Sequence, residues 1–223
     1  VVWYISGYAD GGNGYADEVK MVEHLMKDCQ VSDVEEVVVI SSVNSLNYVN
    51  TGMVNVYGQE KYDNEIDLCC AQNERLMKYL ADKYDLKLIL FRAPYIAKSV
   101  NDTNFLGKEF EAARSGVQYR AAYSRNQYID FISMNNLVEL LVAVSEEYMD
   151  LAGDYTVYSG FSHNYGELAK AVRKKVENFD MEFEDYTNHF DSDMLESAGR
   201  SLRKAYGFVA TDDVIEQIPD LYT

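Results

Sequence analysis

One pair of side chains in this sequence has the types and spacing for proton transfer to a hydroxyl group. Tyr57 and Lys61 stand four residues apart, so on a helix they would lie one turn apart and could face Ser42 at the end of a predicted strand. A lysine ammonium beside a phenol lowers the pKa of that phenol, which then exchanges a proton near neutral pH. The alternative interpretation is a chance match within an irregular loop.

The glycines, cysteines and histidines of the sequence lack the spacing that cofactor binding, a disulfide framework or a metal site needs. The loop Gly11–Gly14 lies between a predicted strand and helix, but it reads Gly-Gly-x-Gly rather than the Gly-x-Gly-x-x-Gly turn that binds a pyrophosphate. Cys69–Cys70 and the third cysteine are predicted to be free thiols, which fits a reducing cytoplasm. His24 and His189 have no Cys, Asp or Glu at zinc-ligand spacing, so no metal site is predicted.

Alternating apolar runs and helical periodicities predict the elements that would position these residues. Short β-branched runs, typical of strands, alternate along the chain with amphipathic stretches, typical of helices. This alternation predicts a parallel sheet with right-handed crossovers. Strands are predicted at 1–5, 37–40, 86–91, 128–133 and 154–158, and helices at 17–29, 65–84, 136–145, 165–176 and 191–206. Residues 43–63 are predicted to be an irregular crossing, and 101–128 a helix and loop. Asn164 and Glu167 have capping-box spacing, so His163 is interpreted as a loop residue rather than a catalyst.

Composition excludes several functional classes. The apolar share of 48% with 13% aromatic residues is typical of a folded globular protein. A formal charge of −17 argues against nucleic acid and anionic membranes as partners. No apolar run approaches the ~20 residues that span a bilayer. We therefore expect a cytoplasmic protein without direct membrane insertion, folded as a single domain over 1–223 with its sheet core in 1–100 and a smaller lobe in 101–223.

Four stretches of the sequence, taken together, are specific for one family of proteins. They are Val37–Ser42, in which paired serines end a strand; Ala71–Leu76 with Leu86–Pro94; Asn126–Ile132 with Asn136–Leu141; and Ser159–Ala169. Together they resemble the NAD-dependent epimerase/dehydratase family of extended short-chain dehydrogenases. The resemblance implies an α/β fold, a Rossmann-like doubly wound parallel sheet with a small C-terminal lobe of the substrate-binding type.

The resemblance covers about Val1–Tyr222 and corresponds to the family from roughly its fourth strand onward. In the family, the preceding half carries the Gly-x-Gly-x-x-Gly turn that binds the pyrophosphate of the cofactor. The sequence of 223 residues does not contain that turn. We therefore expect no cofactor, whereas the alternative of an active enzyme implies NAD or NADP.

Family chemistry depends on a Tyr, on a Lys four residues later and on a Ser or Thr just past the paired serines. Counting back from Glu74 and Arg92 along the matched helix and strand places Ile66 at the Tyr position and Cys70 at the Lys position. An alkyl group has no proton to exchange and a thiol carries no positive charge, so neither replaces its counterpart. Past the serine pair stands Val43.

Two further departures concern ligand binding. Ile129 stands where the family usually has Arg, and Asn136 stands where it usually has Asp. The first change removes a guanidinium that would clamp a diphosphate, a role that Arg125 could take over. If a small ligand binds in the former active-site cleft, the candidates to contact it are Ser41–Ser42, Tyr48 and Arg125.

The leading hypothesis is a non-catalytic domain, or pseudoenzyme, that serves as a dimerisation, interaction or scaffold module. The resemblance implies that helices 17–29 and 65–84 form the surface for a homodimer or a partner protein. Degenerate modules of this family are expected in bacterial exopolysaccharide biosynthesis of the Pel type. The alternative is an active NAD(P)-dependent nucleotide-sugar epimerase, dehydratase or reductase that uses Ser42, Tyr57 and Lys61.

Overall fold

The computed structural model describes residues 1–5, 14–43, 65–97, 111–121, 124–146, 152–161, 163–177, 179–183 and 192–221. The described chain divides into two compact units. Unit 1 comprises Val1–Ala93 and Met149–Val157, and unit 2 comprises Pro94–Tyr148 and Tyr158–Thr223. Each unit has its own sheet pairings and its own helices.

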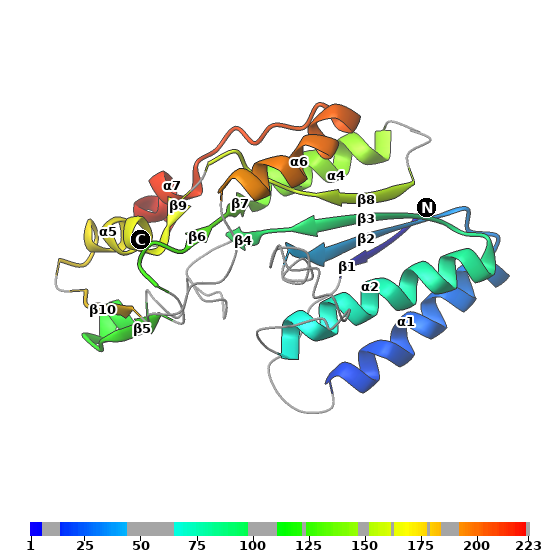
Figure 1. The fold of residues 1–223 in the computed structure, drawn as a ribbon, viewed down its shortest axis with the longest axis horizontal. Helices are drawn as coiled ribbons and strands as arrows, with labels where there is room; N and C mark the ends of the chain where they lie inside the picture. The colour runs from blue at the N-terminus through cyan, green and yellow to red at the C-terminus, as the bar shows by residue number, and fades with distance from the viewer. Residues whose placement is uncertain are drawn as a thin grey trace, which may run out of the picture. The chain divides into compact units, whose positions relative to one another are not determined.

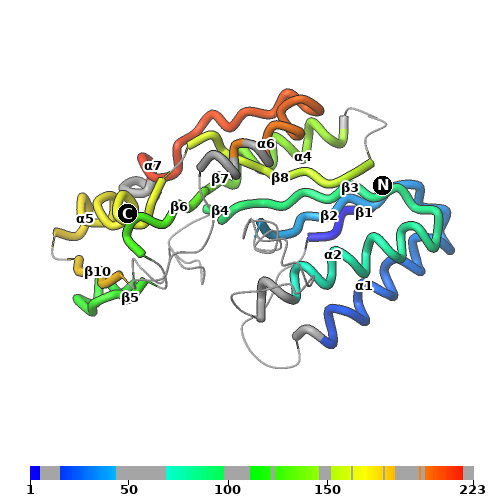
Figure 2. Tube along the Cα trace, in the orientation of Figure 1, coloured from blue at the N-terminus to red at the C-terminus, as the bar shows by residue number. Residues whose placement is uncertain are grey.

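Unit 1 is built on a parallel sheet of four strands in the order β1-β2-β3-β8 (Figure 1). The strands are β1 (Val2–Ile5), β2 (Glu36–Ser42), β3 (Lys87–Ala93) and β8 (Gly153–Thr156), and the helices are α1 (Gly14–Val31) and α2 (Glu65–Tyr84). Figure 2 shows β8, late in the chain, beside β3. The fourth strand of this sheet, β8, therefore comes about sixty residues after β3 in the chain.

The central strand β2 is buried as its sequence predicts. Residues 37–40 of β2 are all at most 3% exposed, although successive side chains point to opposite faces. On one face, alternate residues Val37 and Val39 share an apolar cluster with Val22 and Met26 of α1 and with Leu80 of α2. The two helices therefore cover one face of the sheet, as Figure 1 shows.

In the part of unit 2 that the structure describes, short strands form three pairs, and the buried apolar cluster includes residues of both strands and helices. Its strands and helices are β4 (Tyr95–Ala97), β5 (Tyr119–Ala121), β6 (Tyr128–Ile129), β7 (Phe131–Ser133), α4 (Met134–Glu146), β9 (His163–Asn164), α5 (Tyr165–Arg173), β10 (Met181–Phe183), α6 (Ser192–Tyr206) and α7 (Val214–Leu221). β4 pairs with β7 and β10 with β5, both parallel, while β6 pairs with β9 antiparallel. Leu168 and Val172 of α5 and Val214 of α7 lie in one buried cluster with Phe131.

The structure confirms the predicted fold class, an α/β protein with a parallel sheet, and it corrects several boundaries. The predicted strand 128–133 is divided at Asp130, and the helix predicted to reach 176 ends at Arg173. Residues 101–128 were expected to be helix and loop. Residues 111–115 are helical, whereas Tyr119–Ala121 form β5, because a three-residue strand is too short for a periodicity to reveal. The single-domain organisation stays a prediction.

Each of α1 and α2 ends next to an aspartate in the left-handed region. Asp33 has φ 50° and Asp85 has φ 55°. The following amides return to the helix ends, Val34 N to Cys29 O at 3.0 Å and Leu86 N to Ala81 O at 2.9 Å. This geometry satisfies terminal carbonyls and turns the chain back toward β2 and β3. No helix in the described residues is both long and apolar enough to span a membrane.

Candidate functional site

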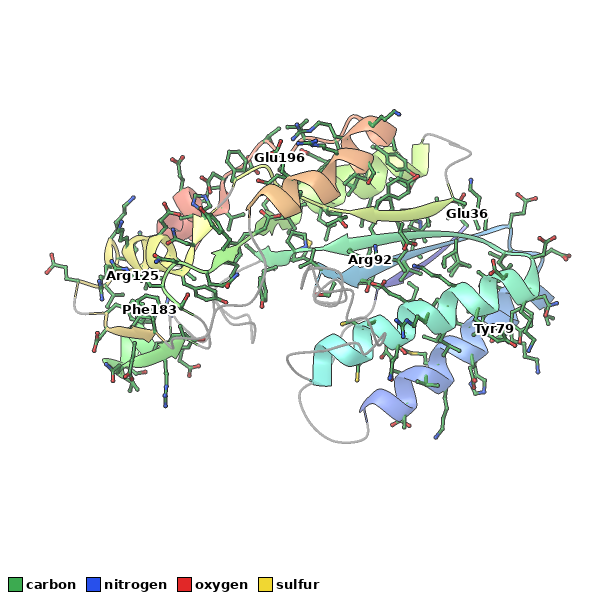
Figure 3. All side chains as sticks on the ribbon, viewed as in Figure 1. Glu36, Tyr79, Arg92, Arg125, Phe183 and Glu196 are labelled. Carbon is green, nitrogen blue, oxygen red and sulfur yellow. The ribbon has the colours of Figure 1, made fainter. Side chains whose placement is uncertain are left out.

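The helix and strand matched to the family meet at Glu74 and Arg92 in unit 1. Arg92 Nη2 lies 2.7 Å from Glu74 Oε2, and Arg92 Nε donates to the same oxygen at 3.0 Å. The two side chains are 11% and 7% exposed. Ser41 Oγ donates to Glu74 Oε1 at 2.7 Å. Figure 3 labels Arg92 on the side of the sheet that faces α2. Ser41 and Arg92 therefore share one carboxylate.

The same network extends to the edge of the sheet. Arg92 Nη2 lies 2.8 Å from Asp154 Oδ2 on β8, and Lys78 on α2 donates to the same oxygen. Burial alone would lower the pKa of Arg92, but its bonds to Glu74 and Asp154 outweigh that effect and raise it. Burial would raise the pKa of Asp154, but the two cations lower it. The charges in this part of the helix–sheet interface are thus used to join α2 to β2, β3 and β8.

A second buried polar contact joins β1 to α1. The phenol of Tyr4 donates to Glu18 Oε1, and both residues are 8% exposed. Burial and the bond to the Glu18 carboxylate raise the pKa of Tyr4 above that of an ordinary phenol. The phenol of Tyr4 is therefore a weaker acid than the phenol of an exposed tyrosine. A neighbouring ammonium would have the opposite effect, because it lowers the pKa of a phenol.

The structure describes only part of the predicted catalytic set. Tyr57 and Lys61 lie outside the described residues, whereas Ser42 ends β2. Cys70, which the resemblance places at the lysine position, lies on α2 and is 1% exposed. The backbone of Ile66 belongs to the start of α2, but its side chain lies outside the description. The catalytic candidates therefore remain predictions.

The ligand-cleft candidates belong to different units. Ser41 and Ser42 are in unit 1, Arg125 is in unit 2, and Tyr48 lies outside the described residues. Arg125 is exposed, and its guanidinium carbon lies 6.0 Å from the ring centre of Phe183. Figure 3 shows these two side chains close together. The proposed cleft stays a prediction.

In unit 2, the residue after Ile129 is a buried acid. Asp130 is 4% exposed, and it accepts hydrogen bonds from Ser159 Oγ and, at 3.1 Å, from Ser159 N. Burial raises the pKa of Asp130 to about 7, although the bonds from Ser159 and the charge of His163 act against burial. Ile129 itself is 5% exposed. A carboxyl group in such surroundings changes its charge near neutral pH.

The interpretation of His163 as a loop residue is wrong. His163 lies on β9, and its Nε2 is 2.8 Å from Asp213 Oδ1 and 2.9 Å from Asp213 Oδ2. No local pattern in the sequence indicates this pair, because fifty residues separate its members. The predicted capping box is confirmed, with Glu167 N to Asn164 Oδ1 and Asn164 N to Glu167 Oε2 both at 3.0 Å.

Asn136, where the resemblance leads one to expect Asp, has a structural role in unit 2. It is 1% exposed and accepts from Thr211 N at 2.7 Å, while its Nδ2 lies 3.1 Å from Thr211 Oγ1 and 3.3 Å from Asp212 Oδ2. A side-chain amide both donates and accepts hydrogen bonds, so Asn136 can bond to the backbone N–H of Thr211 and to the side-chain oxygens. An ionised carboxylate at this position could only accept hydrogen bonds. Among the described residues no group of three or more His, Cys, Asp or Glu side chains is placed to hold a metal ion.

Comparisons with known proteins bear on the fold. No family model matches the sequence, and no curated protein matches it. Three of the solved structures that align over nearly the whole chain illustrate the similarity. They are a partial consensus L-threonine 3-dehydrogenase (TM-score 0.73, 13% identity, covering 99% of this chain and 77% of that one), the Bordetella bronchiseptica enzyme WbmG in complex with NAD and UDP (0.71, 13%, 98% and 71%), and the UDP-N-acetylglucosamine 4-epimerase of Methanobrevibacter ruminantium M1 in complex with UDP-N-acetylmuramic acid (0.72, 15%, 99% and 75%).

These similarities confirm the predicted resemblance at the level of the fold. They also correct one expectation. No cofactor was expected, because the sequence lacks the Gly-x-Gly-x-x-Gly turn, but structural neighbours of this chain are solved with NAD bound. The missing turn was therefore insufficient ground for expecting none, since the remainder of the fold is shared with proteins that hold this cofactor.

Proposed function

We propose that this chain is a non-catalytic module with the fold of NAD-dependent nucleotide-sugar enzymes, which contributes binding or assembly rather than proton and hydride transfer. The observation that supports the proposal most is Cys70, 1% exposed on α2 at the position matched to the family lysine. That position is counted from Glu74 and Arg92, and these two side chains are in contact at 2.7 Å. A buried thiol supplies no positive charge to activate a phenol.

Val43 supports the same proposal. The resemblance places the hydroxyl that holds the substrate oxygen just past the paired serines, and there the chain has Val43, which is 8% exposed. An alkyl side chain has no hydroxyl to hold that oxygen. Ser41, the first serine of the pair, donates to Glu74 Oε1 at 2.7 Å and so joins α2 to the sheet.

An assembly role is the sharper form of the proposal. Helices α1 and α2 lie side by side (Figure 1) and carry apolar side chains that remain exposed, among them Met21 at 49% and Tyr79 at 62%. Exposed apolar groups on two adjacent helices suit an isologous contact with a second copy of the chain. A place in exopolysaccharide biosynthesis of the Pel type remains a prediction from the family resemblance.

One observation favours a second candidate, an active NAD(P)-dependent epimerase, dehydratase or reductase. Structural neighbours are solved with NAD and UDP, or with NAD and UDP-glucuronic acid. In that case the proton transfer would be performed by Ser42, Tyr57 and Lys61. Cys70 would take no part in the reaction.

Turnover separates the two candidates, because binding alone is compatible with both. The chain is incubated with UDP-sugars and NAD or NADP, and epimerised or oxidised sugar and reduced nicotinamide are measured. We expect no turnover, whether or not calorimetry detects bound nucleotide, and no effect of Tyr57→Phe. Turnover that is lost in Tyr57→Phe but kept in the control Tyr79→Phe would replace the first proposal by the second.

Light scattering tests the assembly role. A dimer is expected, and the double change Met21→Lys with Tyr79→Lys should convert it to monomer because two charges would be buried in the contact. Val117→Lys, at a residue of unit 2 that is 59% exposed, is the matched control and should leave the dimer intact. A monomer at high concentration would contradict the assembly role without affecting the proposal on catalysis.

A further inference from the structure

Four cationic side chains lie together where α5 ends. Lys170 and Arg173 belong to the last turn of the helix, Lys174 and Lys175 follow it, and all four are exposed. They are four of only 20 lysines and arginines in a chain whose formal charge is −17. We propose that this surface, the α5 basic patch, binds an extended segment of a partner protein that presents several Asp or Glu carboxylates in succession.

The backbone holds these four residues in a fixed arrangement. On the buried side of α5, Leu168 and Val172 are 0% exposed. Lys174 N donates to Lys170 O at 3.2 Å and Lys175 N donates to Val172 O at 3.0 Å, so the chain continues to turn beyond the end of the helix. Residues three and four apart are neighbours on a helix surface, which places Lys170 beside Arg173 and Lys174. The cations therefore form one surface rather than separate charges.

Within the residues that the structure describes, the charges of the patch are not neutralised. None of the four side chains forms an ion pair with a described carboxylate. Glu167 and Asp180 bond instead to Asn164 N at 3.0 Å and to Gln118 Nε2 at 2.7 Å, and Glu177 is exposed. Like charges one turn apart repel each other, and the partial negative charge at a helix end offsets only part of that repulsion. Carboxylates from a partner would remove the remainder.

Arg173 gives the patch a binding geometry as well as a charge. Its Nε donates to Phe179 O at 2.8 Å, and Phe179 is 3% exposed, so the guanidinium is anchored along one edge. The two Nη groups of this exposed side chain have no partner among the described residues. A guanidinium held in this way can donate to both oxygens of one carboxylate, while a lysine acts as a point charge for the carboxylates that follow.

The charge of the whole chain selects the kind of partner. Nucleic acid or an anionic membrane meets a protein over a wide area, so a formal charge of −17 repels it. A short acidic segment at one helix end interacts mainly with charges within roughly 8 Å, the Debye length at physiological ionic strength. Residues 170–177 carry four cations and one acid, Glu177. The charge that such a segment meets there is therefore positive.

Fluorescence anisotropy of labelled peptides measures the binding on the full chain. The probe is a peptide of alternating Glu and Gly, and its control has Gln in place of each Glu. We expect saturable binding of the Glu peptide that weakens as salt is added, because exposed charges are screened, and no binding of the Gln peptide. Duplex DNA and phosphatidylserine vesicles are added as competitors. Displacement of the Glu peptide by either of them would overturn the proposal.

Two matched double variants locate the binding. Arg173→Glu with Lys174→Glu reverses an adjacent Arg-Lys pair in the patch, and Arg203→Glu with Lys204→Glu reverses an exposed Arg-Lys pair in the last turn of α6. Both variants change the net charge by the same amount. The first should weaken binding of the Glu peptide about tenfold or more, because attractive contacts become repulsive. The second should weaken it less than about twofold, because distant charges are screened.

A third variant, Lys170→Glu with Lys175→Glu, leaves the bond from Arg173 to Phe179 intact. It should weaken binding as the first variant does, with an unchanged far-ultraviolet circular dichroism spectrum. Equal losses in the α5 and α6 variants, or a wild type that does not bind the Glu peptide, would overturn the proposal. The patch belongs to unit 2 and the assembly surface on α1 and α2 to unit 1, so neither result depends on whether the chain forms a dimer.

Discussion

Replacing Asp130 by asparagine should remove a pH dependence from the stability of unit 2. Asp130 is 4% exposed, and burial raises the pKa of its carboxyl to about 7 from an ordinary value of 3.8. Because the folded state holds the proton more tightly than the unfolded state, this group contributes stability that is complete below about pH 4 and is lost as the pH rises through about 7. From about pH 5 to about pH 8 the loss is roughly 2–3 kcal/mol. Asparagine has nearly the same shape, still accepts from Ser159 N and does not titrate.

The measurement is urea unfolding followed by far-ultraviolet circular dichroism at several pH values in that range. We expect the free energy of unfolding of the wild type, minus that of Asp130→Asn, to decrease by roughly 2–3 kcal/mol as the pH rises. Asp82→Asn, at an exposed position on α2, is the control, for which the corresponding difference should be nearly constant. A constant difference for Asp130→Asn, or one that increases with pH, would refute the assignment of a buried, proton-binding carboxyl to this position.

Three further changes test contacts in the two units. Arg92→Met leaves two carboxylates without their guanidinium in the interface of α2 and the sheet, so urea unfolding should show a loss of about 3–5 kcal/mol, of which Arg92→Lys recovers only part. Asn164→Ala should cost about 1 kcal/mol in thermal unfolding because α5 loses its cap, and Asn164→Asp should be nearly neutral. Gly199→Ala would place a Cβ 2.6 Å from the Cβ of Tyr158, so stability should fall by about 1–3 kcal/mol. Tyr158→Gly, which removes the Cβ at the contact, should then cost less in that variant than in the wild type, and equal costs would show that the two residues do not interact.

The two helices and the two seven-residue strands of unit 1 were predictable because each is long enough to show its own pattern. The helix 65–84 was predicted with the observed ends, and β2 reads as an apolar run because it is buried on both faces. Unit 2 was harder for a physical reason. Strands such as β4 and β10 have three residues each and pair with segments far away in sequence, so nothing local distinguishes them from loop.

The polar groups follow the same rule. The capping box of Asn164 and Glu167 spans three residues and was predicted, whereas His163 and Asp213 are fifty residues apart and were not. In the sequence Arg92 and Glu74 are only markers of the family resemblance, and the structure shows that they are bonded to each other. Contacts of this kind depend on how distant segments pack, which a single sequence does not reveal.

Because β8 lies late in the sequence, unit 1 cannot be cut out as one continuous segment, and its sheet cannot form completely until β8 has been made. Unit 1 is discontinuous, so a fragment that ends at Ala93 would lack residues 149–157. Such a fragment would leave the edge of β3 open and deprive Arg92 of one of its two carboxylates. During synthesis the sheet also stays incomplete until β8 has been made, which places a long-range closure late in folding. The single tryptophan, Trp3, lies on β1 at the opposite end of the strand order from β8, so its fluorescence should follow the pairing of β1 with β2 rather than the addition of β8.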